Sequence, residues 1–286
     1  MSPFGMAIVV PTLELFANEF QSNYSTIQFI ISAYLFGLAI AQPFMGFLSD
    51  KLGRKPVMIS GIILFIFASY ICMTAEDLST LIIARFFQGI GGSVGTVTSR
   101  AIIRDSYSGD MAAKSLSRVT ATMGMAPMIA PVVGAFALSL TGSPNGIFMV
   151  TLFIGFAILI PVLFFLPETV TKNDSEREKS VWYKSYSKLL RSEIFVGSTF
   201  IYGFTTGSFF AILAVGSTVF SKNLGIESTG FGLIWSSLTI LYASASFYAG
   251  SLTARIGLMR VLNLGVSLNL IAGFFFALLI YFTGTN

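Results

Sequence analysis

Long apolar runs separated by short polar gaps dominate the hydrophobic pattern of the chain. Each run is about 20 residues long, the length that an α-helix needs to cross the hydrocarbon core of a bilayer. The runs show no alternation of apolar and polar residues, which argues against the strands of a membrane β-barrel. The pattern therefore predicts an all-α integral membrane protein with about nine transmembrane helices. The expected spans are residues 3–20, 26–48, 56–74, 78–103, 113–140, 146–166, 194–220, 229–253 and 261–282.

The positions of the basic residues support this count and give an orientation. All of the 17 Lys and Arg residues except Arg85 and Lys222 lie in or beside every second gap. Because cytoplasmic loops carry the excess of Lys and Arg, that side is expected to be cytoplasmic. The amino terminus is then cytoplasmic as well, and Asn286 lies on the far side.

One polar stretch, residues 171–193, is longer than the other gaps. It divides the chain into an expected six-helix bundle over residues 1–170 and a partial second bundle of three helices over residues 194–286. Within this linker, Trp182 and Tyr186 recur at helical spacing with basic residues nearby. That spacing suits an interfacial helix on the cytoplasmic leaflet. A flexible charged connector is the alternative.

Composition agrees with the bilayer as solvent and narrows the chemistry. Of 286 residues, 54% are apolar and only 10% are charged, against about 25% charged in a typical soluble domain. The chain has no histidine and one cysteine, Cys72. A disulfide within the chain is therefore excluded, as are His-based metal sites and Ser-His-Asp systems. We expect no catalytic residues, no metal and no cofactor, and hence not an enzyme.

A degenerate repeat joins two of the expected cytoplasmic loops. Residues 46–55 and residues 250–260 each hold a glycine, then a basic residue, then a second glycine at the same offsets. The two segments lie six expected helices apart, which is how a two-bundle transporter is built. The repeat also implies that about three further helices would complete the second bundle.

The first of these loops resembles a known family signature. Gly46, Asp50, Lys51, Gly53, Arg54 and Lys55 match G-x-x-x-D-[RK]-x-G-[RK]-[RK] of the major facilitator superfamily at every fixed position. Arg85 to Gly89 resembles the family's R-x-x-Q-G pattern, and Pro167 to Thr169 resembles the P-E-[ST] that ends its first bundle. The resemblance implies a major facilitator-type helical bundle.

The fifth expected helix narrows the resemblance to one group of that family. Drug/proton antiporters carry G-x-x-x-G-P-x-x-G-G there. This chain retains Pro131 and Gly134, adds Pro127, and has alanine at three of the glycine places. It is thus similar to the Bcr/CflA-type multidrug-efflux group.

The resemblance implies roles for several residues. The loop from Gly46 to Lys55 would be a cytoplasmic gating latch between the bundles; a purely topogenic loop would explain its cations but not Asp50 between two glycines. Arg85 would take part in proton coupling, although a structural arginine bonded to backbone carbonyls is the alternative. It is expected to face the bundle interior, because an unpaired cation in lipid is costly. Glu14 is the carboxylate nearest the middle of the first helix, and it either carries the proton or is merely solvated.

A plastic, aromatic substrate cavity is a further expectation. Its candidate residues are Gln88, Met123, Tyr202 and Trp235. Such side chains suit lipophilic cations, although most residues of these types in a membrane bundle serve packing.

Together these features favour a proton-coupled antiporter of the bacterial inner membrane that exports drugs or other small amphipathic molecules by alternating access, an activity that confers antibiotic resistance. Its partners would be a small-molecule substrate, protons and the lipid bilayer, with no nucleic acid, and it would be a monomer when full length. Two alternatives stay open. One is a specific metabolite transporter of the same fold, and the other is a non-transporting membrane fragment, since nine spans leave the second bundle incomplete.

Overall fold

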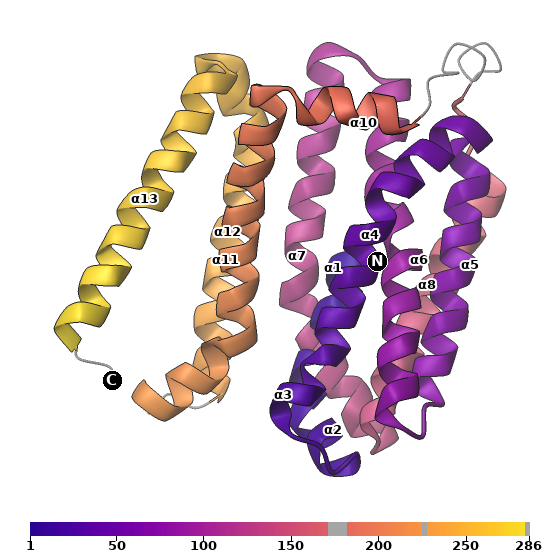
Figure 1. Cartoon of the computed structure of the whole chain (residues 1–286), viewed down its shortest axis with the longest axis vertical. Helices are drawn as coiled ribbons and strands as arrows, with labels where there is room; N and C mark the ends of the chain where they lie inside the picture. Colours follow the sequence, from indigo (N-terminus) through magenta and orange to yellow (C-terminus); the bar gives the residue numbers. More distant parts are fainter. Residues whose placement is uncertain (171–181, 225–227, 284–286) are drawn as a thin grey trace. The chain divides into compact units, whose positions relative to one another are not determined.

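A computed structural model describes residues 1–170, 182–224 and 228–283, which are helical apart from short connections (Figure 1). The all-α prediction is thus confirmed for this part of the chain. The chain divides into two compact units, Met1–Lys179 and Ser180–Asn286. The first unit contains α1 Ser2–Ala7, the 3-10 turn η1 Val10–Thr12, α2 Leu13–Glu19, α3 Tyr24–Ile27, α4 Phe29–Leu52, α5 Arg54–Met73, α6 Leu78–Ser106, α7 Gly109–Thr141, the 3-10 turn η2 Pro144–Gly146 and α8 Ile147–Phe165. The second contains α10 Trp182–Leu190, α11 Glu193–Leu224, α12 Ser228–Ile256 and α13 Leu258–Thr283.

Several of these helices suit a membrane. By length and composition alone, five helical segments among the described residues are long and apolar enough to cross one. They are Tyr24–Leu52, Arg54–Met73, Met111–Thr141, Pro144–Phe165 and Leu258–Phe275. The full count of nine spans stays a prediction.

The first expected span is not one continuous helix. It is divided into α1, η1 and α2, with the break between Ala7 and Leu13. Pro11 lies in this break, and a proline ring clashes with the carbonyl four residues earlier while lacking an N–H to donate. The expectation of a single helix over residues 3–20 was therefore wrong in detail.

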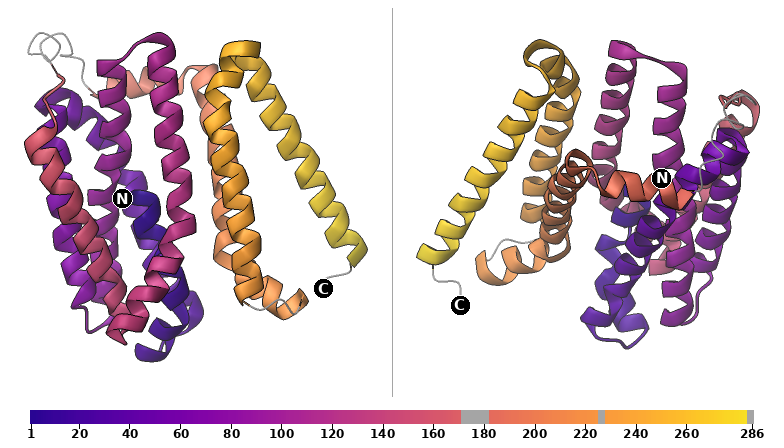
Figure 2. Two further views of the ribbon diagram at one scale, coloured as in Figure 1. Left: turned by 180° about the vertical axis from the view of Figure 1, so that it is seen from behind. Right: turned by 45° about the horizontal axis from the view of Figure 1, so that its top comes forward.

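Within the first unit, α6 packs along both α4 and α5, and α5 packs along α8 (Figure 2). Glycines allow the closest of these approaches. A Cβ on Gly37 of α4 would lie 2.1 Å from the carbonyl oxygen of Phe86 in α6, and a Cβ on Gly89 of α6 would lie 2.1 Å from that of Tyr34 in α4. The two backbones touch, as small residues permit in membrane helix pairs.

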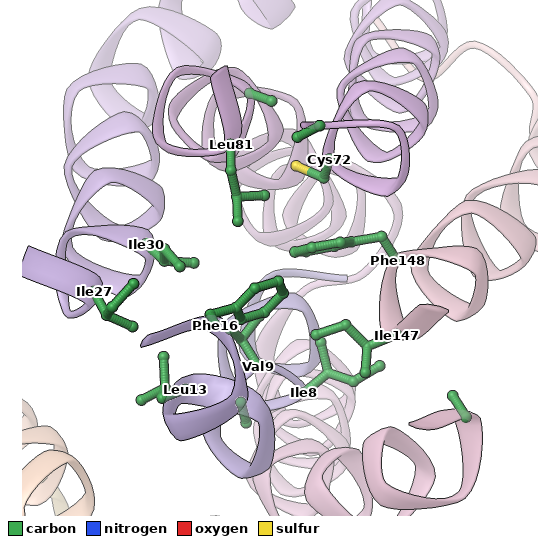
Figure 3. Close-up of a cluster of buried hydrophobic side chains, with 14 of the residues drawn as sticks. Ile8, Val9, Leu13, Phe16, Ile27, Ile30, Cys72, Leu81, Ile147 and Phe148 are labelled. Carbon is green, nitrogen blue, oxygen red and sulfur yellow. The ribbon is translucent and has the colours of Figure 1, made fainter. Parts of the chain in front are cut away.

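A buried apolar cluster fixes the broken first helix against the rest of the unit (Figure 3). Phe16 of α2 faces Phe148 of α8, with ring centroids 6.3 Å apart. The same cluster includes Ile8 from the break, Leu81 of α6 and Cys72 of α5. All five side chains are buried, so van der Waals packing holds the divided segment in place.

Candidate functional site

Arg85 of α6 is fully buried at the centre of the first unit. Its Nε donates a hydrogen bond to the backbone oxygen of Ile30 at 3.1 Å, and its Nη1 donates to the backbone oxygen of Gly5 at 2.9 Å. Nη1 also donates to Oε1 of Gln88, one helical turn away, at 2.5 Å. One guanidinium thus ties α6 to the start of α4 and to α1, ahead of the break in the first helix.

Two aromatic rings flank the same guanidinium. Its central carbon lies 4.3 Å from the ring centroid of Tyr34 and 5.8 Å from that of Phe148. Ring faces attract cations, most strongly where water is excluded. The Tyr34 hydroxyl is itself fixed, because it donates to the backbone oxygen of Ser2 at 3.0 Å. The rings therefore supply some of the stabilisation that a counter-ion would otherwise give.

Gln88 extends the cluster to two more helices. Its Nε2 donates to the Ser69 hydroxyl of α5 at 2.7 Å and to the Thr151 hydroxyl of α8 at 3.2 Å. Those hydroxyls in turn donate to the carbonyl oxygens of Phe65 and Phe148 in their own helices, at 2.7 Å and 2.9 Å. Both hydrogens of the Gln88 amide and its oxygen are therefore used, so the side chain has one defined orientation.

The charge balance of this cluster is unusual. Every hydrogen-bond acceptor that the structure gives Arg85 is a neutral oxygen, and its buried Nη2 has no partner among the described residues. A buried cation normally pairs with a carboxylate. The expected burial of Arg85 in the bundle interior is confirmed, and its bonds to backbone carbonyls match the structural alternative. Its role in proton coupling stays a prediction.

Glu14, the predicted partner in proton coupling, lies elsewhere. It is exposed in the first turn of α2, beyond the break in the first helix. No hydrogen bond or ion pair joins its carboxylate to Arg85 in this part of the chain. The structure does not bring the two predicted residues together.

The predicted gating loop contains a second polar cluster, centred on Arg54. Arg54 is the first residue of α5 and is buried. It forms an ion pair with Asp50, and its Nε donates to Oδ2 of Asp105 at the end of α6 at 2.9 Å. Its Nη1 also donates to the Ser49 hydroxyl at 2.8 Å. Unlike Arg85, this cation has two carboxylate partners.

Glu168, just beyond α8, caps the start of α5 from a distance in sequence. Its carboxylate accepts hydrogen bonds from the backbone N–H groups of Arg54 at 2.8 Å and Lys55 at 3.1 Å. It also accepts from the backbone N–H groups of Thr169 and Val170, at 3.0 Å and 3.1 Å. Partial burial acts to raise the pKa of Glu168, but these four donors outweigh it and lower the pKa below its usual value.

Lys55 and Gly53 complete this connection. Nζ of Lys55 donates to the backbone oxygen of Leu163 in the last turn of α8, at 2.9 Å. Each of the two helix ends is thus capped by a residue of the other segment. Gly53 has a φ of +101°, and a Cβ there would lie 2.5 Å from Oε2 of Glu168. Its backbone conformation favours glycine, and a larger residue would also have to displace the Glu168 carboxylate.

The other two predicted loop residues are less constrained. A Cβ on Gly46 would meet its nearest neighbour, Cγ1 of Val97, at 3.6 Å, which is ordinary contact. Lys51 is exposed at the end of α4. Packing therefore does not explain why the loop has these residues, and their predicted gating role stays a prediction.

The antiporter-type residues lie in α7. Pro127 and Pro131 are inside this helix. Gly134, one turn further on, would place a Cβ 2.6 Å from the backbone oxygen of Ile8, at the end of α1. Helix α7 thus comes close to the backbone at the end of α1 where the motif retains its glycine.

The proposed cavity residues are dispersed. Gln88 is fully buried in the Arg85 cluster, and Met123 is partly buried on α7. Tyr202 of α11 is exposed in the second unit. The side chain of Trp235 lies outside the described residues. The substrate cavity stays a prediction.

Three residues of the Arg54 cluster were not predicted as contacts: Ser49, Asp105 and Glu168. Asp105 accepts from Arg54 and also from the Thr169 hydroxyl, at 3.1 Å. A signal was present in the sequence, because carboxylates are scarce in this chain and Asp105 and Glu168 both follow expected spans, 78–103 and 146–166, that end on the predicted cytoplasmic side. The predicted topology puts the start of α5 on that same cytoplasmic side.

Comparisons with known proteins agree with this architecture. A sequence profile of the Major Facilitator Superfamily matches residues 1–286. The chain is 25% identical over 274 residues to a "Bicyclomycin resistance protein homolog" of Haemophilus influenzae, covering 96% of this chain and 69% of the relative. It is 30% identical over 276 residues to an "Uncharacterized MFS-type transporter YdgK" of Bacillus subtilis, covering 95% of this chain and 68% of the relative.

Two further similarities extend the set. A "Multidrug resistance protein MdtL" of Vibrio parahaemolyticus is 27% identical over 256 residues, which is 86% of this chain and 63% of that protein. The crystal structure of the human organic anion transporter MFSD10 (TETRAN) superposes with a TM-score of 0.63 at 17% identity, covering 85% of this chain and 62% of that one. At that identity the structural similarity shows the fold alone.

Proposed function

Because the chain belongs to the Major Facilitator Superfamily, a family of transporters and not of enzymes, we propose that it exports drugs or similar small amphipathic molecules in exchange for protons. The protein is a multi-pass membrane protein. Relatives that match most of its length are named for bicyclomycin resistance and multidrug resistance. Those names support export as the direction of transport and amphipathic drugs as the substrate class.

The single observation that carries the proposal is the buried Arg85 cluster. An ionisable side chain inside a membrane bundle is costly, and it marks a substrate or proton pathway by default. Here the cation contacts the backbone of α1 just before the first helix breaks. Discontinuous helices that expose backbone groups are typical of transporter binding sites. The cluster thus combines a buried ionisable side chain with an interrupted helix, and both features are typical of transport pathways.

We propose the bacterial inner membrane as the location, with the amino terminus in the cytoplasm. The distribution of Lys and Arg supports this orientation. The loop around Arg54 then lies at the cytoplasmic end of the first unit. Its ion pairs join α4, α5 and α6 within that unit, and we propose that the loop acts as a latch that is broken and remade during alternating access.

Ethidium accumulation in bacteria that lack their own drug pumps tests the proposal. Cells that produce the protein should accumulate less ethidium than cells with an empty vector, and a protonophore should abolish the difference. The variant Arg85→Lys should accumulate ethidium like the vector cells, because a lysine cannot reach the carbonyl oxygens of Ile30 and Gly5 together.

Arg100→Lys is the matched control, since it makes the same change in the same helix at a partly exposed position. It should export ethidium like the wild type. Equal accumulation with and without the protein, across several lipophilic cations, would contradict drug export. Full export by Arg85→Lys would contradict the role assigned to the buried cluster.

A further inference from the structure

Helix α10, Trp182–Leu190, is separate from the helix that follows it. The Ser192 N–H donates to the carbonyl oxygen of Leu189 at 2.9 Å and ends one helix, while the Ser192 hydroxyl accepts from the N–H of Phe195 at 3.4 Å and begins the next. Serine at such a position caps a helix start. Figures 1 and 2 show α10 crossing the axis of α11 instead of extending it. If α11 crosses the bilayer, α10 must run along its surface.

The sequence of α10 divides into two opposite sides at helical spacing. Trp182, Tyr186 and Leu189 fall on one side, and Lys184 and Lys188 fall on the other. The helix contains no acidic residue. Arg191 follows in the next turn, on the basic side. A short helix with one apolar side and one basic side is typical of a segment that lies in a membrane interface.

The side chains described at the end of this helix are all exposed. Leu189 is 42% exposed and Leu190 is 67% exposed, although both are large apolar residues. Lys188 and Arg191 are exposed as well. Apolar groups on a water-facing connector would be a solubility liability. A lipid surface would cover them and leave the basic residues at the level of the headgroups.

We propose that α10 lies in the headgroup region of the cytoplasmic leaflet and binds anionic phospholipids through Lys184, Lys188 and Arg191. The charge sign decides between lipid classes, because the helix has two cations and no acid, and Arg191 follows it. Such a charge favours anionic over zwitterionic headgroups. Each basic residue near an anionic surface strengthens binding about fivefold. This inference concerns the connector alone and does not depend on what the protein transports.

Tryptophan fluorescence of the whole protein in proteoliposomes tests the proposal. Position 235 holds the other tryptophan, so Trp235→Phe leaves Trp182 as the single reporter. Brominated phospholipids, which quench indoles that lie within the bilayer, should quench Trp182 strongly in vesicles containing phosphatidylglycerol. Lys184→Gln with Lys188→Gln should weaken the association of α10 with the surface about 25-fold and so reduce this quenching. Pure phosphatidylcholine vesicles should give the same reduced value.

Two variants keep the result interpretable. Arg255→Gln with Arg260→Gln removes the same charge from another predicted cytoplasmic loop, and it should leave the quenching unchanged. Ser187→Pro keeps every charge but breaks the helix, and it should reduce the quenching. Water-like emission from Trp182 without quenching would overturn the proposal. Full quenching in Ser187→Pro would also overturn it, because that result indicates a flexible charged connector. The same holds if the quenching does not change when Lys184 and Lys188 are replaced or when the lipid charge is removed.

Discussion

The carboxylate of Glu168 accepts a hydrogen bond from the backbone N–H of Arg54 at 2.8 Å, across 114 positions of sequence. The last residues after α8 therefore cap the first turn of α5. Capping residues are normally found next to the helix they cap, and here the fold supplies one from a distance. The same two segments are joined a second time through Lys55 and the end of α8.

Removing the Glu168 cap should destabilise the first unit. Glu168→Ala leaves the N–H groups of Arg54 and Lys55 without an acceptor, which costs about 1–2 kcal/mol. Thermal unfolding in detergent measures the loss. Glu19→Gln is the control, since Glu19 is exposed and its replacement removes the same charge. An unchanged midpoint in Glu168→Ala, or an equal loss in both variants, would contradict the capping role.

The same carboxylate should make stability depend on pH in the acid range. The pKa of Glu168 is lowered in the folded protein, so its stabilisation is complete above the pKa of the unfolded chain and is lost as pH falls through the folded value. Unfolding midpoints measured between neutral and acidic pH should converge for wild type and Glu168→Gln at the acid end. A difference between them that stays constant over the whole range would show that ionised Glu168 contributes nothing.

Gly53 and Gly257, which occupy matching places in the two repeated loops, should respond differently to alanine. Both have positive φ, +101° and +89°. Such a conformation costs a non-glycine residue about 1–3 kcal/mol. Only at Gly53 would the added Cβ also meet Glu168, whereas at Gly257 no atom of the described residues lies within 4 Å. Gly53→Ala should therefore lower the unfolding midpoint more than Gly257→Ala. The opposite order would contradict the Glu168 contact.

The sequence predicted those features that follow from local pattern. The apolar runs predicted the long helices. The high cost of exposing a cation to lipid predicted that Arg85 lies in the interior of the bundle, where it is buried. The break in the first helix was missed although Pro11 was visible, because hydropathy does not register a lost hydrogen bond. The contacts of Arg54 with Asp105 and of Glu168 with α5 were missed for another reason. They join segments far apart in sequence, and helix packing alone brings them together.

The Gln88 amide should matter to folding more than the hydroxyl of Thr151. Gln88→Leu leaves Nη1 of Arg85 with only the Gly5 oxygen and should cost about 1–3 kcal/mol. Thr151→Val leaves one buried amide hydrogen of Gln88 without an acceptor and should cost about 1 kcal/mol, the low end of that range, since Gln88 keeps its shorter bond to Ser69, at 2.7 Å. Unfolding midpoints of the two variants give the comparison. Similar values for both would mean that Gln88 does not orient Arg85.

The last prediction separates the latch from the fold. Asp50→Asn keeps the shape of the side chain and removes its charge, while Arg54 retains Asp105 and Ser49 as partners. The Asp50 side chain is 42% exposed in its ion pair, and pairs of that kind contribute about 0–1 kcal/mol to stability. The variant should therefore insert and unfold almost like the wild type. If the loop is a latch that needs the anion, its ethidium export should nevertheless fall toward the vector level. Asp105→Asn, which removes the charge that Arg54 and Thr169 share, should instead lower stability as well as export. Wild-type export by well-expressed Asp50→Asn would rule out the latch and leave the loop a purely topogenic role.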